Sequence, residues 1–155
     1  MLPTTTQRVP AHTRLRSNQR IREKTEARLE YYAARPHLIG QRLAELDREW
    51  DIERTLEVNG SALALTGLTL GTTVNRKWLL LPFAVVGFCL QHALQGWCPP
   101  LAVFRRLGIR TQREIDEERF ALMALRGDFR DLPDAEEVSG DPEAVRELLE
   151  RMRRD

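Results

Sequence analysis

Between residues 58 and 104 the chain is almost free of charge, and this block limits the possible folds more than any other feature of the sequence. It holds only two charged side chains, Arg76 and Lys77, although the whole chain has 24 Lys and Arg and 23 Asp and Glu residues. These two residues, together with Asn75, separate uncharged runs of 18 and 27 residues. Because about 20 apolar helical residues cross the ~30 Å hydrocarbon core of a bilayer, the block predicts a two-helix transmembrane hairpin.

Two tryptophans in the second uncharged run are the expected interface anchors. Trp78 and Trp97 are 19 residues apart, which is about 28 Å along an α-helix. Indole rings favour the membrane–water interfaces, so this separation predicts one ring at each interface. Pro82 lies one turn after Trp78, and it is expected in the first turn of the second helix, where its missing N–H does little harm.

The first run carries a stripe of small residues that favours close helix packing. Its members recur every three or four positions, at Gly60, Ala64, Gly67 and Gly71. On the second run the expected facing surface consists of Ala84, Gly87, Gln91 and Leu94. The short tip makes the two helices antiparallel, and the small residues are also predicted to allow self-association. Threonine hydroxyls in the first run can bond to backbone carbonyls where water is absent.

The alternative to a membrane hairpin is a hairpin buried inside a soluble helical protein, since such a core is also apolar on every side. The flanking segments hold few large apolar side chains to cover it, so lipid is the favoured surrounding. Seven arginines lie in residues 43–57 and 105–119, against two basic residues at the tip. The excess of positive charge near the membrane ends predicts that both termini are cytoplasmic.

The rest of the chain predicts amphipathic helices on both sides of the hairpin, and hence an all-α fold. Residues 1–13 are expected to be a disordered basic tail, although the five arginines and absence of acid in residues 1–22 also fit an organellar transit peptide. Residues 14–57 are predicted to form a helical arm of two helices, which break near Pro36.

The second helix of this arm is predicted over residues 37–56. Its apolar positions are spaced three and four apart, at Ile39, Leu43, Leu46 and Trp50. This spacing places them on one buried face. The opposite face is expected to be solvated, and it carries Arg42, Glu45, Asp47, Arg48, Glu49 and Glu53.

Residues 105–130 are predicted to form a capped cytoplasmic helix. Thr111-Gln-Arg-Glu114 has the pattern of a capping box, and Gly127 is a natural stop. The acidic run from Asp116 to Glu118 is interpreted as a solvated helix face. Residues 131–155 are predicted to be a linker and a C-terminal helix that starts at Asp141-Pro142-Glu143. Its inward face is expected to consist of Val145, Leu148, Leu149 and Met152.

Few residues are candidates for a catalytic or metal-binding role. Cys89 and Cys98 are too few for a disulfide scaffold and are expected to be reduced. With His92 they make only three potential ligands where zinc prefers four, so no metal or other cofactor is predicted. Cys98 is the candidate reactive thiol, because Arg105 and Arg106 nearby favour a thiolate; the alternative is an inert apolar residue at a helix end.

No nucleophile–base–acid set, phosphate-binding loop or carboxylate pair indicates an enzyme, and a net charge of +1 gives no reason to expect nucleic-acid binding. His92 and the neighbouring Gln91 and Gln95 are interpreted as a hydrogen-bond cluster between helices. In an oligomer the same cluster would line a path for a small solute.

The motif Gly96-Trp-Cys-Pro99 followed by Leu107-Gly-Ile109, behind the glycine- and threonine-rich first run, resembles the YgaP-like transmembrane domain family over residues 59–109. The resemblance implies a small two-helix unit of the bacterial inner membrane, sometimes fused behind a rhodanese sulfurtransferase domain. Cys98 is the position onto which a sulfur association would be carried. The chain departs from the family in lacking a rhodanese domain, in doubling the proline at Pro100, and in its long charged arms.

These observations predict a non-enzymatic, multi-pass inner-membrane protein that acts as a membrane-anchored scaffold or interaction module. Its expected partners are the lipid bilayer and either further copies of itself or another membrane protein. The first alternative is a thiol- or sulfur-handling accessory protein that uses Cys98. The second is an oligomeric conduit for small solutes, which requires several copies because one hairpin cannot enclose a pore.

Overall fold

The chain folds into helices joined by short turns, and the computed structural model describes residues 4–130, 132–134 and 137–154. No β-strand occurs in these residues, which confirms the all-α class. The elements in chain order are α1 (Arg8–Ala11), α2 (Leu15–Ala33), η1 (Pro36–Leu38), α3 (Ile39–Leu46), α4 (Ile52–Thr73), η2 (Arg76–Leu79), α5 (Leu80–Gln95), α6 (Pro99–Leu107), α7 (Gln112–Arg126) and α8 (Pro142–Arg154).

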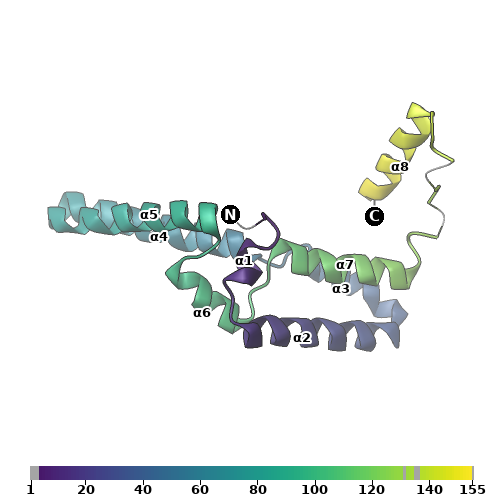
Figure 1. The fold of residues 1–155 in the computed structure, drawn as a ribbon, viewed down its shortest axis with the longest axis horizontal. Coiled ribbons are helices and arrows are strands. Elements are labelled where there is room, and N and C mark those ends of the chain that lie inside the picture. Colours follow the sequence, from purple (N-terminus) through teal and green to yellow (C-terminus); the bar gives the residue numbers. More distant parts are fainter. Residues whose placement is uncertain (1–3, 131, 135–136, 155) are drawn as a thin grey trace.

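The molecule is elongated and has two main parts (Figure 1). Helices α4 and α5 lie side by side and project from one end as a hairpin, while α2, α3 and α7 form a separate bundle at the other end, called the body below. Helices α1 and α6 lie between the two parts, and α8 stands apart from the body beyond α7.

The body is held together by a small apolar core. Ile39, Leu43 and Leu46 of α3 pack against three buried side chains of α7, and Leu29 and Tyr32 of α2 cover the edge. The three α7 residues are Ile115, Leu122 and Met123. The predicted three-and-four spacing of the α3 face is therefore present in the structure, up to Leu46.

The predicted single helix over residues 37–56 is wrong, because two helices occupy this segment. Helix α3 ends at Leu46, and a new helix begins at Ile52, where the Asp51 carboxylate accepts a hydrogen bond of 2.9 Å from the amide of Arg54. An aspartate in this position satisfies a free amide of the first turn and so fixes a helix start. As a result Trp50 lies between the helices and is 47% exposed, not on a buried face.

Local capping signals after the hairpin are confirmed. The Thr111 hydroxyl accepts from the amide of Glu114, and the Glu114 carboxylate accepts from the amide of Thr111, which together form the predicted capping box of α7. Gly127 ends α7 with a φ of +95°, a conformation that glycine adopts without strain. Asp141 accepts from the amide of Glu143 where α8 begins.

The expected inward face of α8 differs from the structure. Val145, Leu149 and Met152 are exposed, and Leu148 is partly buried and lines a pocket together with Pro133 and Val138. The helix forms where its cap predicts, but it does not pack on the body (Figure 1).

A second apolar cluster joins the hairpin to the rest of the molecule. It consists of Val9, Ile52, Cys98 and Leu101, from α1, α4, the start of α6 and α6 itself. The segment from residue 4 to residue 13 was expected to be a disordered tail, but it contains α1 and buries Val9 at this junction. The packing of Val9 at this junction holds the N-terminal segment in place.

The second uncharged run is not one helix. Gly96 ends α5 with a φ of +80°, and α6 starts three residues later at Pro99, so α6 crosses the predicted boundary at residue 104. The hairpin therefore differs from the predicted residues 58–104 at both ends, since it comprises α4, η2 and α5, begins at Ile52 and excludes residues 96–104. At its tip the Asn75 side chain accepts from the amide of Lys77.

Candidate functional site

Two glycines let α4 and α5 approach closely. A Cβ on Gly67 would lie 2.5 Å from Cδ of Pro82, and a Cβ on Gly71 would lie 2.5 Å from Cδ2 of Leu79. Both glycines are buried, Gly67 against Pro82 and Leu81 of α5 and Gly71 against Leu79 of η2. Gly60 is farther from its neighbours, since its Cβ would be 3.5 Å from Sγ of Cys89, and Ala64 is half-buried. Because η2 and α5 of the same chain cover Gly67 and Gly71, these two positions are not free for self-association.

The α5 face that meets this stripe differs from the predicted one. Gly87 has no atom within 4 Å of a Cβ position, Ala84 and Leu94 are exposed, and Gln91 is half-buried. The facing residues are instead Leu81, Pro82, Val85 and Cys89. The prediction paired small residues with small residues, whereas α4 supplies the glycines and α5 supplies the larger side chains that fill the space.

The tryptophans lie near opposite ends of α5, as their spacing predicts. Trp78 belongs to η2 beside the tip, and Trp97 lies in the turn between α5 and α6. Both are partly exposed.

At the base of the hairpin, polar groups from three remote segments meet. Nε2 of His92, in the last turn of α5, lies 2.9 Å from Oε2 of Glu53 in the first turn of α4. An Nη atom of Arg8 in α1 donates to the other carboxylate oxygen at 3.0 Å, and its second Nη donates to the carbonyl of Ala93 at 3.3 Å. This arrangement ties the N-terminal segment and both hairpin helices together.

The Cys98 thiol lies beside the imidazole of His92 and interacts with it. Both side chains line the same groove. His92 is buried, and its Nδ1 atom has no hydrogen bond of ordinary geometry. Cys98 is also buried. A thiol, an imidazole and a carboxylate are therefore placed in sequence, in the order of a nucleophile, a base and a group that orients the base.

The Glu53 carboxylate is shared by His92 and Arg8, one on each of its oxygens. A carboxylate only accepts hydrogen bonds, so Nε2 of His92 carries the proton that it shares with Glu53. The other ring nitrogen, Nδ1, is buried and has no hydrogen-bond partner.

Local backbone features position the three groups. The Asp51 cap fixes Glu53 in the first turn of α4. Gly96 turns the chain out of α5, and Cys98 is extended (φ −152°) directly before the two prolines that begin α6. A Cβ on Gly96 would lie 2.5 Å from the carbonyl oxygen of Arg8, so this turn needs glycine both for its φ and for the approach of α1.

A groove of about 490 Å³ runs from this cluster along the hairpin. Its polar end contains Arg8, Glu53, His92 and Cys98. Its walls toward the tip are mostly apolar and include Leu56, Leu63, Leu81, Val85 and Phe88. The volume lies within the range of ~300–1,000 Å³ that is typical of small-ligand sites.

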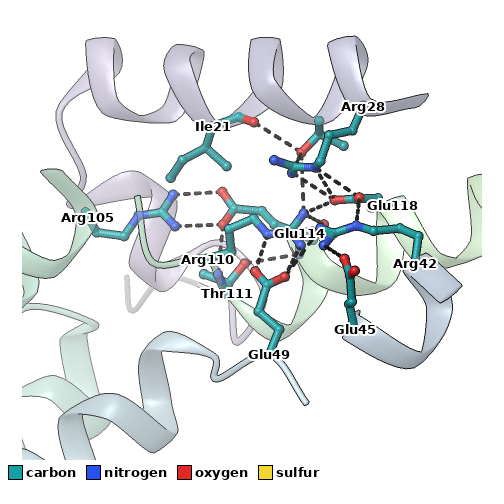
Figure 2. A network of polar contacts seen from close by, with 11 residues as sticks. Ile21, Arg28, Arg42, Glu45, Glu49, Arg105, Arg110, Thr111, Glu114 and Glu118 are labelled. Carbon is teal, nitrogen blue, oxygen red and sulfur yellow. Dashed lines mark hydrogen bonds and ion pairs between the residues drawn. The ribbon is translucent and has the colours of Figure 1, made fainter. Parts of the chain in front are cut away.

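A second polar cluster, called the arginine–glutamate network, lies inside the body (Figure 2). Its centre is Glu118, which is 0% exposed. The carboxylate accepts from Arg28 at 2.8 Å and from Arg42 at 2.9 Å, and it also pairs with Arg110. Arg110 makes two further bonds of 2.7 Å to Glu49.

The interpretation of the 116–118 run as a solvated face is therefore wrong for Glu118, and that of the charged face of residues 37–56 is wrong for Arg42 and Glu49. Burial raises the pKa of Glu118, but hydrogen bonds from Arg28 and Arg42 and the charge of Arg110 override it and lower the pKa to about 2. The carboxylate is thus held ionised inside the body and neutralised by three arginines.

Arg105 belongs to a neighbouring buried ion pair. It donates to both carboxylate oxygens of Glu114 at 2.7 Å and to the side chains of Asn18 and Thr13. Burial acts to raise the pKa of Glu114, but the bonds from Arg105 and Thr111 outweigh it and leave the pKa lowered. Arg105 was expected to activate Cys98, but its guanidinium is committed to Glu114, so His92 is the relevant neighbour of the thiol.

Within the described residues, no group of three or more His, Cys, Asp or Glu side chains is arranged to hold a metal ion. Both cysteines are free thiols. No family model, curated protein or solved structure matches the chain, so the resemblance to the YgaP-like domain stays a prediction.

Glu53 and Arg8 were not among the candidate site residues, although a signal for Glu53 exists. If the chain is folded back about Asn75, residues at similar distances from the tip become neighbours, as Gly67 and Pro82 do in the structure. The same operation brings the first turn of α4 to the level of residues 95–98, and His92 lies in the turn just before them. Arg8 has no comparable signal, because α1 reaches this place through tertiary packing alone.

Proposed function

We propose that the chain is a membrane-anchored interaction module whose hairpin of α4 and α5 lies in a bilayer while the body stays outside. The observation that carries this proposal is the apolar outer surface of an almost uncharged hairpin. Leu65 of α4 and Leu80, Phe83, Val86 and Leu90 of α5 are each more than 60% exposed. A patch of this extent, on a projecting element whose charged residues lie only near its base and its tip, favours lipid over water.

One helix in the described residues, Arg76–Gln95, is long and apolar enough to cross a membrane, and little of it is buried inside the molecule. Helix α4 does not meet the same test. Its crossing depends on packing against α5, and the glycine contacts at Gly67 and Gly71 provide that packing.

The hydroxyl groups of α4 support a position in lipid. Thr66, Thr69, Thr72 and Thr73 each donate to a carbonyl one turn earlier in the same helix, at 2.6–2.9 Å. A hydroxyl that bonds within its own helix needs no water, so these residues are compatible with a hydrocarbon surrounding.

The charged body belongs on the side from which both ends of the hairpin emerge. Arg105 and Arg110, two of the seven arginines that predict cytoplasmic termini, are buried in ion pairs. The remaining five still exceed Arg76 and Lys77 at the tip, so we retain the proposed orientation and the bacterial inner membrane as the location. The exposed apolar face of α8, with Val145, Leu149 and Met152, supports a protein partner outside the membrane.

Membrane fractionation tests the proposal. The full chain is expected in the membrane pellet after alkaline carbonate washing, and in solution only with detergent. Recovery of a monodisperse chain from the cytosol in plain buffer would refute the proposal. A cysteine placed at Asn75 in a Cys89→Ser, Cys98→Ser background should be labelled by an impermeant maleimide from the outside of intact cells, and labelling only after permeabilisation would reverse the orientation.

A second candidate function is nucleophilic chemistry at the Cys98 thiol, supported by the unpaired Nδ1 atom of His92 beside it. In this function His92 takes the thiol proton and Glu53 orients His92. Cys98 is then expected to react with iodoacetamide faster than the exposed Cys89, and the difference should disappear in His92→Gln. Equal reactivity of the two cysteines, in folded protein, would refute it.

A further inference from the structure

The Cys98 thiol lies at the end of an apolar groove, and the two features together define a kind of substrate. The groove walls come from both hairpin helices, through Leu56 and Leu63 of α4 and Leu81, Val85 and Phe88 of α5. The polar lining groups lie at the end of Cys98 and His92 and along the first turns of α4, through Glu57 and Asn59, and the lining beyond them toward the tip is apolar. A ligand that fits this division has one reactive polar end and one long apolar end.

We propose that Cys98 is an S-acylation site, at which the thiol takes a fatty acyl group from an acyl thioester and the acyl chain lies in the groove. The proposal deepens the second candidate function, because it names the substrate class of that nucleophile. A carrier of sulfane sulfur has no use for an apolar groove of about 490 Å³ beside the thiol, whereas an acyl chain fills it and continues the lipid-facing surface of the hairpin.

The proton path follows from the hydrogen bonds. Glu53 holds Nε2 of His92 at 2.9 Å, and Nδ1 is the ring atom left to take up the thiol proton, which gives a Cys98 thiolate beside a protonated imidazole. The sulfur then attacks the carbonyl carbon of the thioester. A carbon–sulfur bond to Cys98 forms, and the bond to the donor sulfur breaks with its electron pair on that sulfur. His92 returns the proton to the released donor thiol, and no oxidant or reductant is needed.

The chain offers a matched control at a second cysteine. Cys89 lines the same groove and is more exposed than Cys98, but its neighbour is Gly60 and not the imidazole. If exposure alone decided acylation, Cys89 would be modified first. If the imidazole decides it, Cys98 is modified and Cys89 is not.

The experiment uses the full chain reconstituted into phosphatidylcholine vesicles and incubated with hexadecanoyl-coenzyme A. Intact-mass and peptide mass spectrometry measure acylation before and after treatment with hydroxylamine, which cleaves thioesters. We expect one acyl group per chain, on Cys98 and removed by hydroxylamine. Peptide mapping should find it on Cys98 and not on Cys89, and it should vanish in Cys98→Ser and form at least tenfold more slowly in His92→Gln.

Two measurements separate a chemical role of His92 from a structural one. Circular dichroism checks that His92→Gln keeps its helices. The acylation rate of this variant should recover toward alkaline pH, where the thiol loses its proton to solvent, since only the proton acceptor is missing. Absence of recovery in a folded variant would contradict the proposed role.

The remaining outcomes each decide the proposal. Acylation of Cys89 at the same rate, or acylation that does not depend on His92, would mean a non-specific reaction and would overturn it. Hexadecanoyl-coenzyme A that is held without a covalent bond would also overturn it. If Cys98 reacts selectively with iodoacetamide but takes no acyl group, the acyl proposal fails while the nucleophilic thiol stands; if it does neither, both fail.

Discussion

The hairpin and the body are both helical, but they distribute polar and apolar groups in opposite ways. In the body the buried centre contains ionised side chains, with Glu118 among three arginines. In the hairpin the contact between helices is made by glycines, and the exposed side is apolar. An exposed apolar surface such as that of the hairpin favours aggregation in water. Charged side chains such as those of the body are costly to place in lipid. The two parts therefore favour different surroundings.

The comparison shows that helical content says little about surroundings, whereas the location of charge says much. The body keeps its carboxylates and guanidinium groups in contact with each other. The hairpin keeps charge at its tip, at Arg76 and Lys77, and at its base, where α4 carries Glu53, Arg54 and Glu57. There Glu53 meets Arg8 and His92. The apolar hairpin and the charged part of the molecule meet at this base, and the candidate site lies there.

The largest expected effect is in the body. Glu118→Ala leaves Arg28, Arg42 and Arg110 without their shared counterion, and removal of one partner from a buried ion pair costs about 3–5 kcal/mol. Chemical denaturation monitored in the body should show this loss of stability. Glu117→Ala is the control, because Glu117 is exposed and pairs only with Arg113 on the surface. Equal effects of the two variants would contradict a central role for Glu118.

The next test addresses the hairpin surface. Val86, near the middle of the candidate span Arg76–Gln95, is 63% exposed, and Val86→Asp should impair insertion by about 2.5–3.5 kcal/mol. A microsomal glycosylation assay measures this as the inserted fraction. Leu15→Asp is the control, since Leu15 is also well exposed but lies in α2 of the body. If both variants insert as well as the original chain, the two regions do not differ as proposed.

A smaller effect is expected from the contact between α4 and α5. In Gly67→Ala the new Cβ lies 2.5 Å from Cδ of Pro82, whose ring cannot turn aside, and overpacking of this kind costs about 1–3 kcal/mol. Unfolding of the hairpin in mixed detergent micelles measures it. Gly87→Ala, where the Cβ meets open space, should be neutral or slightly stabilising, so a loss there as large as at Gly67 would contradict the observed packing face.

The pH dependence of the body gives a more gradual signal. The pKa of Glu118 is about 2 in the folded body and near 4.5 as its ordinary value. Its contribution to stability is therefore complete above about pH 4.5 and is lost as the pH falls toward 2. A single group contributes at most about 1.4 kcal/mol per pH unit in this window. Thermal unfolding of Glu118→Gln should have a flatter acid profile, and an unchanged profile would assign the effect to other groups.

The smallest expected effect concerns the junction. Asp51→Ala removes the cap of α4, and loss of such a cap typically costs about 1 kcal/mol. Hydrogen exchange at the amide of Arg54, which bonds to Asp51 in the structure, should become faster. Asp51→Asn should retain most of the protection, because asparagine also caps helices well.

Local patterns in the sequence predict much of the fold. The capping box at Thr111, the stop at Gly127 and the start of α8 after Asp141 depend on residues within three positions of each other, and each is present in the structure. The Asp51 cap is a signal of the same kind, but the apolar spacing that continues to Trp50 conceals it. The end of α5 at Gly96 is likewise local, since a glycine before two prolines is a frequent helix stop.

The sites depend on pairings that no local pattern contains. Glu118 follows two other acidic residues and has the appearance of a surface position, and its three arginines come from α2, α3 and the turn before α7. Arg8 and Glu53 are 45 positions apart, and Cys98 becomes a neighbour of His92 only because Gly96 turns the chain. Composition therefore predicts the hairpin, whereas tertiary packing creates the polar clusters at its base and in the body.

The close approach of Arg8 to Gly96 has a consequence for the order of maturation. The ribosome releases α1 early, but the surface on which α1 rests exists only after the whole hairpin and its final turn have been synthesised. Docking of the N-terminal segment therefore comes late in assembly, and it brings the Arg8 guanidinium to the Glu53 carboxylate as one of the final steps.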